Sequence, residues 1–193
     1  MRLPADVQAA IKKQLPKLIK RPFRRDVDKR FKSLKDKMIK EFLNHRITKE
    51  IQEGPQGSAS GSLNGVTNLF AFIGFDDGDD PIAPILTIFE NIKITQDTEY
   101  IQKGVGRKYK IDFPTAQEIF DVTPMPWAIG RSWAQGIEVG ISGLGYLLRK
   151  KAKGSRSGVA IQSSKQVRSA KFKNTKYISA LINKYKKRFD KLK

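Results

Sequence analysis

Four aspartates are the residues whose type and spacing come closest to a chemical site in this sequence. They lie within one short stretch, at Asp76, Asp77, Asp79 and Asp80. Clustered carboxylates supply the hard oxygen ligands that Mg²⁺ and Ca²⁺ prefer, and a nuclease would use such a metal. The spacing is not that of the D-x-[DN]-x-[DN]-G calcium loop, and a nuclease needs further carboxylates that converge in space. We therefore predict no metal and no cofactor, and interpret the cluster as a solvated turn or an acidic patch for subunit docking.

Other side chains that do chemistry are scarce. The chain has no cysteine, which excludes disulfides, thiolate zinc sites and thiol nucleophiles. His45 is the only histidine, so we assign it a structural or surface role. A Gly/Ser-rich loop at residues 53–65 lacks the Lys-Ser or Lys-Thr of a phosphate-binding loop, and no Gly-x-Ser-x-Gly or His-Glu-x-x-His motif is present. These absences predict a protein that is not an enzyme.

Basic residues dominate the two ends of the chain. The net charge is +19, and residues 1–50 and 131–193 are basic whereas residues 51–130 are acidic overall. Basic blocks are typical of contact with nucleic acid or another anionic surface, but a solvated face has the same composition. No base-reading motif accompanies them, so any nucleic-acid contact is predicted to be independent of sequence. The candidate DNA- or partner-contacting residues are Arg149, Lys150, Lys151, Lys153, Arg156, Arg168, Lys171 and Lys173.

The elements that must position these residues form one core with extensions. A chain of 193 residues, 39% of them hydrophobic, is expected to bury a single core. We predict a basic N-terminal arm at residues 1–25, with Pro16 placed to kink or interrupt its helix. One α+β domain at residues 26–193 follows, with a flexible loop at residues 53–65 and a basic region at residues 149–193. No apolar stretch is long enough to span a bilayer, and the N-terminus is not a signal peptide, so we expect no membrane contact.

Helical periodicity recurs in several parts of this domain. Apolar residues at steps of three and four predict a helix at residues 26–45, with lysines on its opposite side. Asp80 before Pro81 is a helix start signal and predicts a helix at residues 81–91, with Pro81 as its first residue. Thr115 and Glu118 have capping-box spacing, which indicates a short helix. A terminal helix is predicted from about Thr175, with Asn or Thr as its N-cap.

The remaining segments predict a small antiparallel sheet and a glycine-rich helical stripe. Residues 66–75 read as a buried strand, residues 91–114 as a hairpin and residues 123–130 as an extended segment that carries Trp127. Residues 131–153 keep a helical apolar stripe despite several glycines, which indicates close packing against a neighbour in the same chain or in another subunit. A further strand is predicted at residues 159–167. The N-terminal and C-terminal amphipathic helices are expected to pack on the sheet.

Three stretches of the sequence carry a resemblance to a known class of proteins. They read FLNHRITKEIQEGPQGSASGSLNGVTNLFAFIGFDDGDDPIAPI, MPWAIGRSWAQGIEVGISGLGYLL and KFKNTKYISALINKYKK, and together they fall within residues 40–190. They resemble virion proteins of marine T4-like tailed bacteriophages. The order of elements is also similar to that of small neck or tail-completion proteins, although the long basic N-terminal arm departs from the compact ones.

The resemblance implies a structural role at the head-to-tail junction or the tail end of a virion. Such proteins assemble as cyclic rings, here a hexamer or a dodecamer, around the channel for double-stranded DNA. The implied partners are other copies of the chain, further neck, connector or tail proteins, and DNA through contacts without sequence preference. The implied location is the virion, after assembly in the host cytoplasm. The alternative that the residues leave open is a stand-alone basic protein that binds nucleic acid without sequence specificity.

Overall fold

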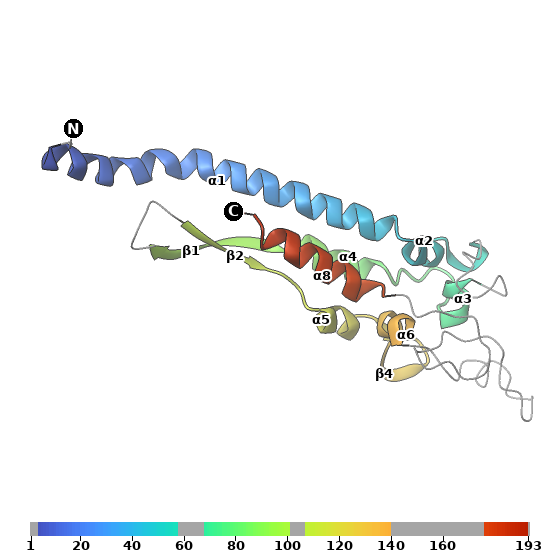
Figure 1. Cartoon of the computed structure of the whole chain (residues 1–193). Coiled ribbons are helices and arrows are strands. Elements are labelled where there is room, and N and C mark those ends of the chain that lie inside the picture. The colour runs from blue at the N-terminus through green and yellow to red at the C-terminus, as the bar shows by residue number, and fades with distance from the viewer. Residues whose placement is uncertain (1–3, 58–67, 101–106, 140–175, 193) are drawn as a thin grey trace, which may run out of the picture.

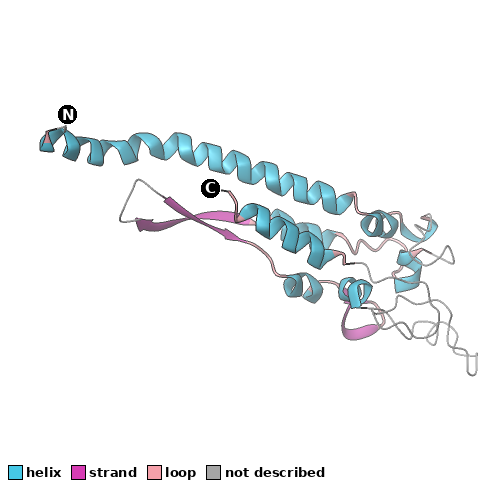
Figure 2. Cartoon of the chain, viewed as in Figure 1, coloured by secondary structure: helices cyan, strands magenta, loops and turns pink. Residues whose placement is uncertain are grey.

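The molecule is elongated, with one long helix running along its length (Figure 1). The computed structural model describes residues 4–57, 68–100, 107–139 and 176–192. Helices combine with two two-stranded antiparallel sheets, which confirms the predicted α+β class. Figure 2 shows that the two strand pairs lie apart, the larger one beside the long helix and the smaller one at the other end of the molecule.

The long helix α1 extends over Ala5–Leu43. At 1.5 Å per residue its 39 residues span about 58 Å. The predicted helix at residues 26–45 is therefore confirmed in kind, but its predicted start was wrong, and Pro16 does not interrupt it. A proline removes one backbone hydrogen bond while fixing a φ close to the helical value, so the flanking turns can carry the helix onward. The helix also passes residue 25, the predicted limit of the arm, without a break.

Three short helices follow α1, and one of them corrects a strand prediction. They are α2 (Arg46–Gln52), the 3₁₀ turn η1 (Gly54–Gln56) and α3 (Leu69–Ile73). Residues 66–75 were predicted as a strand, yet residues 69–73 form a buried helix. Asn68 Oδ1 accepts from the Ala71 N–H at 2.8 Å, and Gly74 ends the helix at a φ of +86°. A short apolar run suits a buried strand or a buried helix equally, so the residues at its two ends select the helix.

Helix α4 (Ala83–Glu90) begins just after a turn that an aspartate holds in place. Asp80 Oδ1 accepts hydrogen bonds from the N–H groups of Ile82 at 3.1 Å and Ala83 at 3.0 Å. Asp80 therefore holds the turn before α4, but its predicted N-cap position was wrong, because the N-cap residue is Ile82, whose side chain makes no capping bond. The predicted first residue was wrong, since Pro81 precedes the helix and Pro84 occupies its first turn. The N–H groups at the start of a helix have no partner within the helix, so a proline, which lacks an N–H, is tolerated at both positions.

The predicted hairpin is confirmed by β1 (Lys93–Tyr100) and β2 (Arg107–Asp112). Ile94 pairs with Ile111 in its register, and both are partly buried against the core. Helix α5 (Ala116–Asp121) then begins with the predicted capping box, in which Thr115 and Glu118 each accept from the other's backbone N–H.

The last described elements are a small hairpin with a short helix at one end of the molecule, and the C-terminal helix. Strands β3 (Pro124–Met125) and β4 (Ala128–Ser132) turn the predicted extended segment into a small hairpin, and α6 (Trp133–Val139) follows. The terminal helix α8 covers Ile178–Phe189, so its predicted start near Thr175 was wrong. Its N-cap position is Tyr177, whose side chain makes no capping bond. The predicted strand at residues 159–167 and the glycine-rich stripe beyond residue 139 lie outside the described residues.

The core lies where α1, α8, α4 and the larger hairpin meet. Helix α8 lies antiparallel beside the C-terminal half of α1 (Figure 1), with Phe31 and Phe189 ring centroids 5.5 Å apart. Phe113, just after the hairpin, lies 5.3 Å from Phe189. Aromatic rings at these separations add to the stability that their burial already provides. Among the described helices, none combines the length and apolar character needed to cross a membrane.

Candidate functional site

The predicted acidic patch is a tight exposed turn between α3 and α4. Asp79 Oδ2 accepts from the Asp76 N–H at 2.9 Å, and the Asp79 N–H donates to the Asp76 carbonyl at 3.1 Å. Gly78 at the apex has a φ of +94°, a conformation that favours glycine. Asp80 accepts from the N–H groups of Ile82 and Ala83, so two of the four carboxylates hold the local backbone in place.

The other two carboxylates of the turn point to solvent. Asp76 and Asp77 are exposed, and their side chains make no hydrogen bond or ion pair with the residues that the structure describes. No set of three or more His, Asp or Glu side chains in those residues is placed to hold a metal ion. The turn therefore presents two charges suited to a contact with a basic surface.

His45 belongs to the junction between α1 and α2. Its Nδ1 accepts from the Ile47 N–H at 3.3 Å, so the ring caps α2, and its centroid lies 4.8 Å from that of Tyr177. Burial, followed by the charge of Arg46, lowers the pKa of His45 below its usual value. Because Nδ1 accepts a hydrogen bond in this cap, the ring must be neutral. This contact gives His45 a structural role.

A second buried polar contact joins α2 to the start of α8. The hydroxyls of Thr48 and Tyr177 form a hydrogen bond of 2.5 Å, and both side chains are buried. Burial raises the pKa of Tyr177 well above its usual range, while the bond with Thr48 acts in the opposite direction. A hydroxyl so enclosed cannot reach a substrate, so this contact serves packing and not chemistry.

Glu41 joins the last turn of α1 to α8. Its carboxylate accepts from the Lys184 ammonium and from the Tyr185 hydroxyl, the latter at 2.9 Å. Burial raises the pKa of Glu41, but the bonds from Lys184 and Tyr185 outweigh it and leave that pKa below its usual value. Burial and the bond to Glu41 raise the pKa of Tyr185 to about 12. These partners fix α8 on α1.

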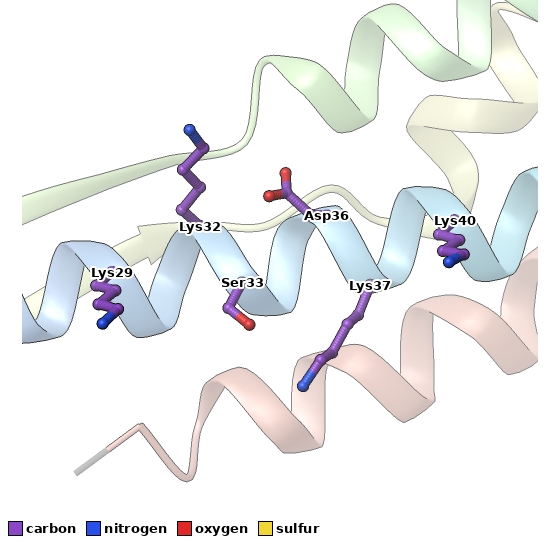
Figure 3. A pocket seen from close by; sticks show the side chains of 6 residues that line it. All are labelled: Lys29, Lys32, Ser33, Asp36, Lys37 and Lys40. Carbon is purple, nitrogen blue, oxygen red and sulfur yellow. The ribbon is translucent and has the colours of Figure 1, made fainter.

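The outer face of α1 carries a basic surface that no motif had indicated. Four exposed lysines, here called the lysine face, line a shallow hollow together with Ser33 and Asp36 (Figure 3). At the two edges of this face, Lys37 extends toward α8 and Lys32 extends away from α8 (Figure 3). The lysine face consists of Lys29, Lys32, Lys37 and Lys40.

Three other cations of α1 have partners on the protein. Arg24 pairs with Asp28 at 3.0 Å and Arg30 pairs with Asp26 at 2.8 Å. Lys35 donates to backbone carbonyls at the end of α4. The lysine face, by contrast, forms no ion pair or hydrogen bond with the part of the chain that the structure describes. The signal for it was present in the sequence, because lysines lie opposite the apolar stripe of residues 26–45.

The basic residues selected from the sequence cannot be placed. All eight, Arg149, Lys150, Lys151, Lys153, Arg156, Arg168, Lys171 and Lys173, lie outside the described residues. Their contact with DNA or a protein partner stays a prediction. Among the residues that the structure describes, the candidate basic surface is therefore the lysine face of α1.

Comparisons with known proteins identify no relative of this chain. No protein-family model, no curated protein and no solved structure matches the chain. The functional interpretation consequently depends on the chain's own residues and on the resemblance of the quoted segments.

Proposed function

We propose that the chain is a non-enzymatic structural protein of a tailed-bacteriophage virion. It belongs at the neck or the tail end, as a tail-completion, tail-terminator or head-tail connector protein, and assembles as a ring around the DNA channel. The resemblance of segments within residues 40–190 supports this proposal. Its partners are further copies of itself and other neck, connector or tail proteins.

The observation that carries the proposal is the separation of exposed charge. Asp76 and Asp77 extend from a turn whose backbone is fixed by Asp79 and Asp80. Lysine and arginine outnumber the aspartates on the exposed side of α1, and the sequence of α8 has no acidic residue. In a cyclic ring one surface of each subunit meets a different surface of the next, so unlike charges on two surfaces suit this contact.

Reversing the two exposed charges of the turn tests ring formation. The variant D76K/D77K is expected to reduce the fraction of protein in rings by at least about tenfold, since like charges across an interface cost several kcal/mol. Asp79 and Asp80 are kept because their carboxylates hold the backbone of the turn and of the residues that lead into α4. Mass photometry of the purified full chain, alone and with its neighbouring virion proteins, measures the ring population.

A matched variant separates this contact from a change of net charge. E90K/D112K reverses two exposed carboxylates outside the turn and alters the net charge equally. It should leave the rings intact. A wild-type chain that stays monomeric with and without the other virion proteins, or equal losses in the two variants, contradicts the proposal.

The second candidate is a stand-alone basic protein that binds nucleic acid without sequence specificity. The lysine face favours it, because unpaired lysines attract phosphates regardless of base sequence. This candidate predicts a monomer that binds DNA with a steep salt dependence and does not enter particles. Oligomeric state in the presence of virion proteins distinguishes the two.

A further inference from the structure

We infer that the lysine face of α1 binds the phosphate backbone of double-stranded DNA. The inference takes its partner from the proposed position around a DNA channel, and it deepens that function by assigning the surface. The predicted basic residues at 149–173 are not needed for it. Three properties of α1 support it: the placement of the lysines, the charge around them and the absence of other binding groups on the same face.

The lysines share one side of a rigid helix. At about 100° per residue, Lys29, Lys32, Lys37 and Lys40 fall within an arc of about 140° and extend about 16 Å along the helix axis. The opposite side of α1 packs into the core through Phe31, Met38 and Phe42. The ammonium groups therefore project from a backbone that is held in place. A fixed arrangement of this kind suits contact with the regularly spaced phosphates of duplex DNA.

The charge on this side of the molecule is strongly positive. Asp36 is the single carboxylate among the six residues that line the hollow. Lys37 points toward α8 (Figure 3), whose last turn adds Lys186, Lys187 and Arg188 and whose sequence from residue 178 to 189 has no acidic residue. Duplex DNA carries about one negative charge per 1.7 Å of axis, so several phosphates lie within reach of this length of helix.

The chemistry of the face selects the DNA backbone among anionic partners. Helices that lie on membranes need bulky apolar residues beside the basic ones, but the large apolar residues of this part of α1 face the core. Base recognition uses bidentate Arg, Asn or Gln, and single strands are held by exposed aromatic rings. The hollow is lined by Lys, Ser and Asp alone, so the contact is with phosphates.

The salt dependence of binding measures these contacts directly. Fluorescence anisotropy with a mixed-sequence DNA duplex, repeated over a range of salt concentrations, gives the slope of log K against log salt for the full chain. Each phosphate contact contributes about 0.9 to that slope. The variant K29Q/K32Q/K37Q/K40Q should therefore lose about three to four units of slope, with unchanged circular dichroism and denaturation midpoint.

A charge-matched control decides whether position matters. K49Q/K93Q/K110Q/K176Q removes four exposed lysines from other elements and gives the same net charge. Its slope should change by less than about one unit. Equal losses in the two variants, an unchanged slope in the first, or loss of rings with DNA binding intact would each overturn the assignment; the last outcome makes the face a protein interface. Since D76K/D77K keeps all four lysines, failure of ring formation and failure of DNA contact remain distinguishable.

Discussion

His45 makes the stability of this protein depend on pH at the scale of one residue. Its Nδ1 must be unprotonated to accept from the Ile47 N–H, and burial lowers its pKa in the folded state. The unfolded chain, with a pKa of about 6.5, binds this proton more readily. Stability is thus full above about pH 6.5 and decreases as the pH falls through that value toward the folded pKa. We expect urea titrations to give a lower free energy of unfolding at about pH 5 than at about pH 7.

The variant His45→Asn isolates this contribution. Asparagine keeps an oxygen that can cap α2 but does not titrate. Its stability should change less between the same two pH values than that of the wild type. A variant whose stability falls just as steeply assigns the effect to the carboxylates and removes His45 from the explanation.

Residues that act within their own turn were predictable from the sequence, and residues that act at a distance were not. Thr115 pairs with Glu118 as predicted, and Asp80 accepts hydrogen bonds just before α4, although it is not the N-cap residue that was predicted. Each contact spans only two or three positions. Thr48 meets Tyr177 across 129 positions, and only the folded chain brings them together. The lysine face lies between these cases, because periodicity places its residues and the i,i+4 pairs Arg24–Asp28 and Arg30–Asp26, whereas the contact of Lys35 with the end of α4 needs the folded chain.

At the scale of elements, α8 begins with a cap supplied by another helix. Glu138 of α6 accepts hydrogen bonds from the N–H groups of Tyr177 at 3.2 Å and Ser179 at 2.7 Å. The Tyr177 side chain provides no cap of its own. Glu138→Ala should reduce the free energy of unfolding by about 1–2 kcal/mol, in the range for a lost helix cap. Equilibrium denaturation followed by circular dichroism measures the loss.

Two further variants test whether capping explains that loss. Glu138→Gln keeps an accepting oxygen and should recover most of the stability. Glu90→Ala removes an exposed carboxylate whose side chain caps no helix, and should change stability by less than about 0.5 kcal/mol. Equal losses in Glu138→Ala and Glu90→Ala would show that charge, and not the cap, is responsible.

Element types followed from the sequence where a period or a capping motif distinguished helix from strand, and failed where neither did. The apolar stripe of α1 repeats at steps of three and four, and the residues of β2 alternate. The continuous apolar run of α3 has neither period, so it was predicted as a strand. The start of α8 was misplaced for another reason, because its cap comes from Glu138 and not from a nearby Asn or Thr.

At the scale of the whole molecule, aromatic packing joins segments that are far apart in the chain. Phe189, 4% exposed, lies between Phe31 of α1 and Phe113 after the hairpin. The two tryptophans lie at the opposite end, where Trp127 donates to the Ile73 carbonyl at 2.7 Å and Trp133 is buried. If residues 26–193 form the single domain that the sequence predicts, a destabilising substitution at Phe189 must also lower the stability of the region around both tryptophans.

Phe189→Ala tests that cooperativity. Truncating a buried phenylalanine costs about 3–5 kcal/mol, which is a large share of the 5–15 kcal/mol that stabilises a typical domain. We expect urea midpoints from tryptophan fluorescence and from far-UV circular dichroism to fall together. Phe189→Leu keeps most of the apolar volume and should shift both midpoints less. A tryptophan transition that stays at the wild-type midpoint while the helical signal shifts would divide the chain into two units, because the end that holds Trp127 and Trp133 would then be stable without the packing of α8 on α1.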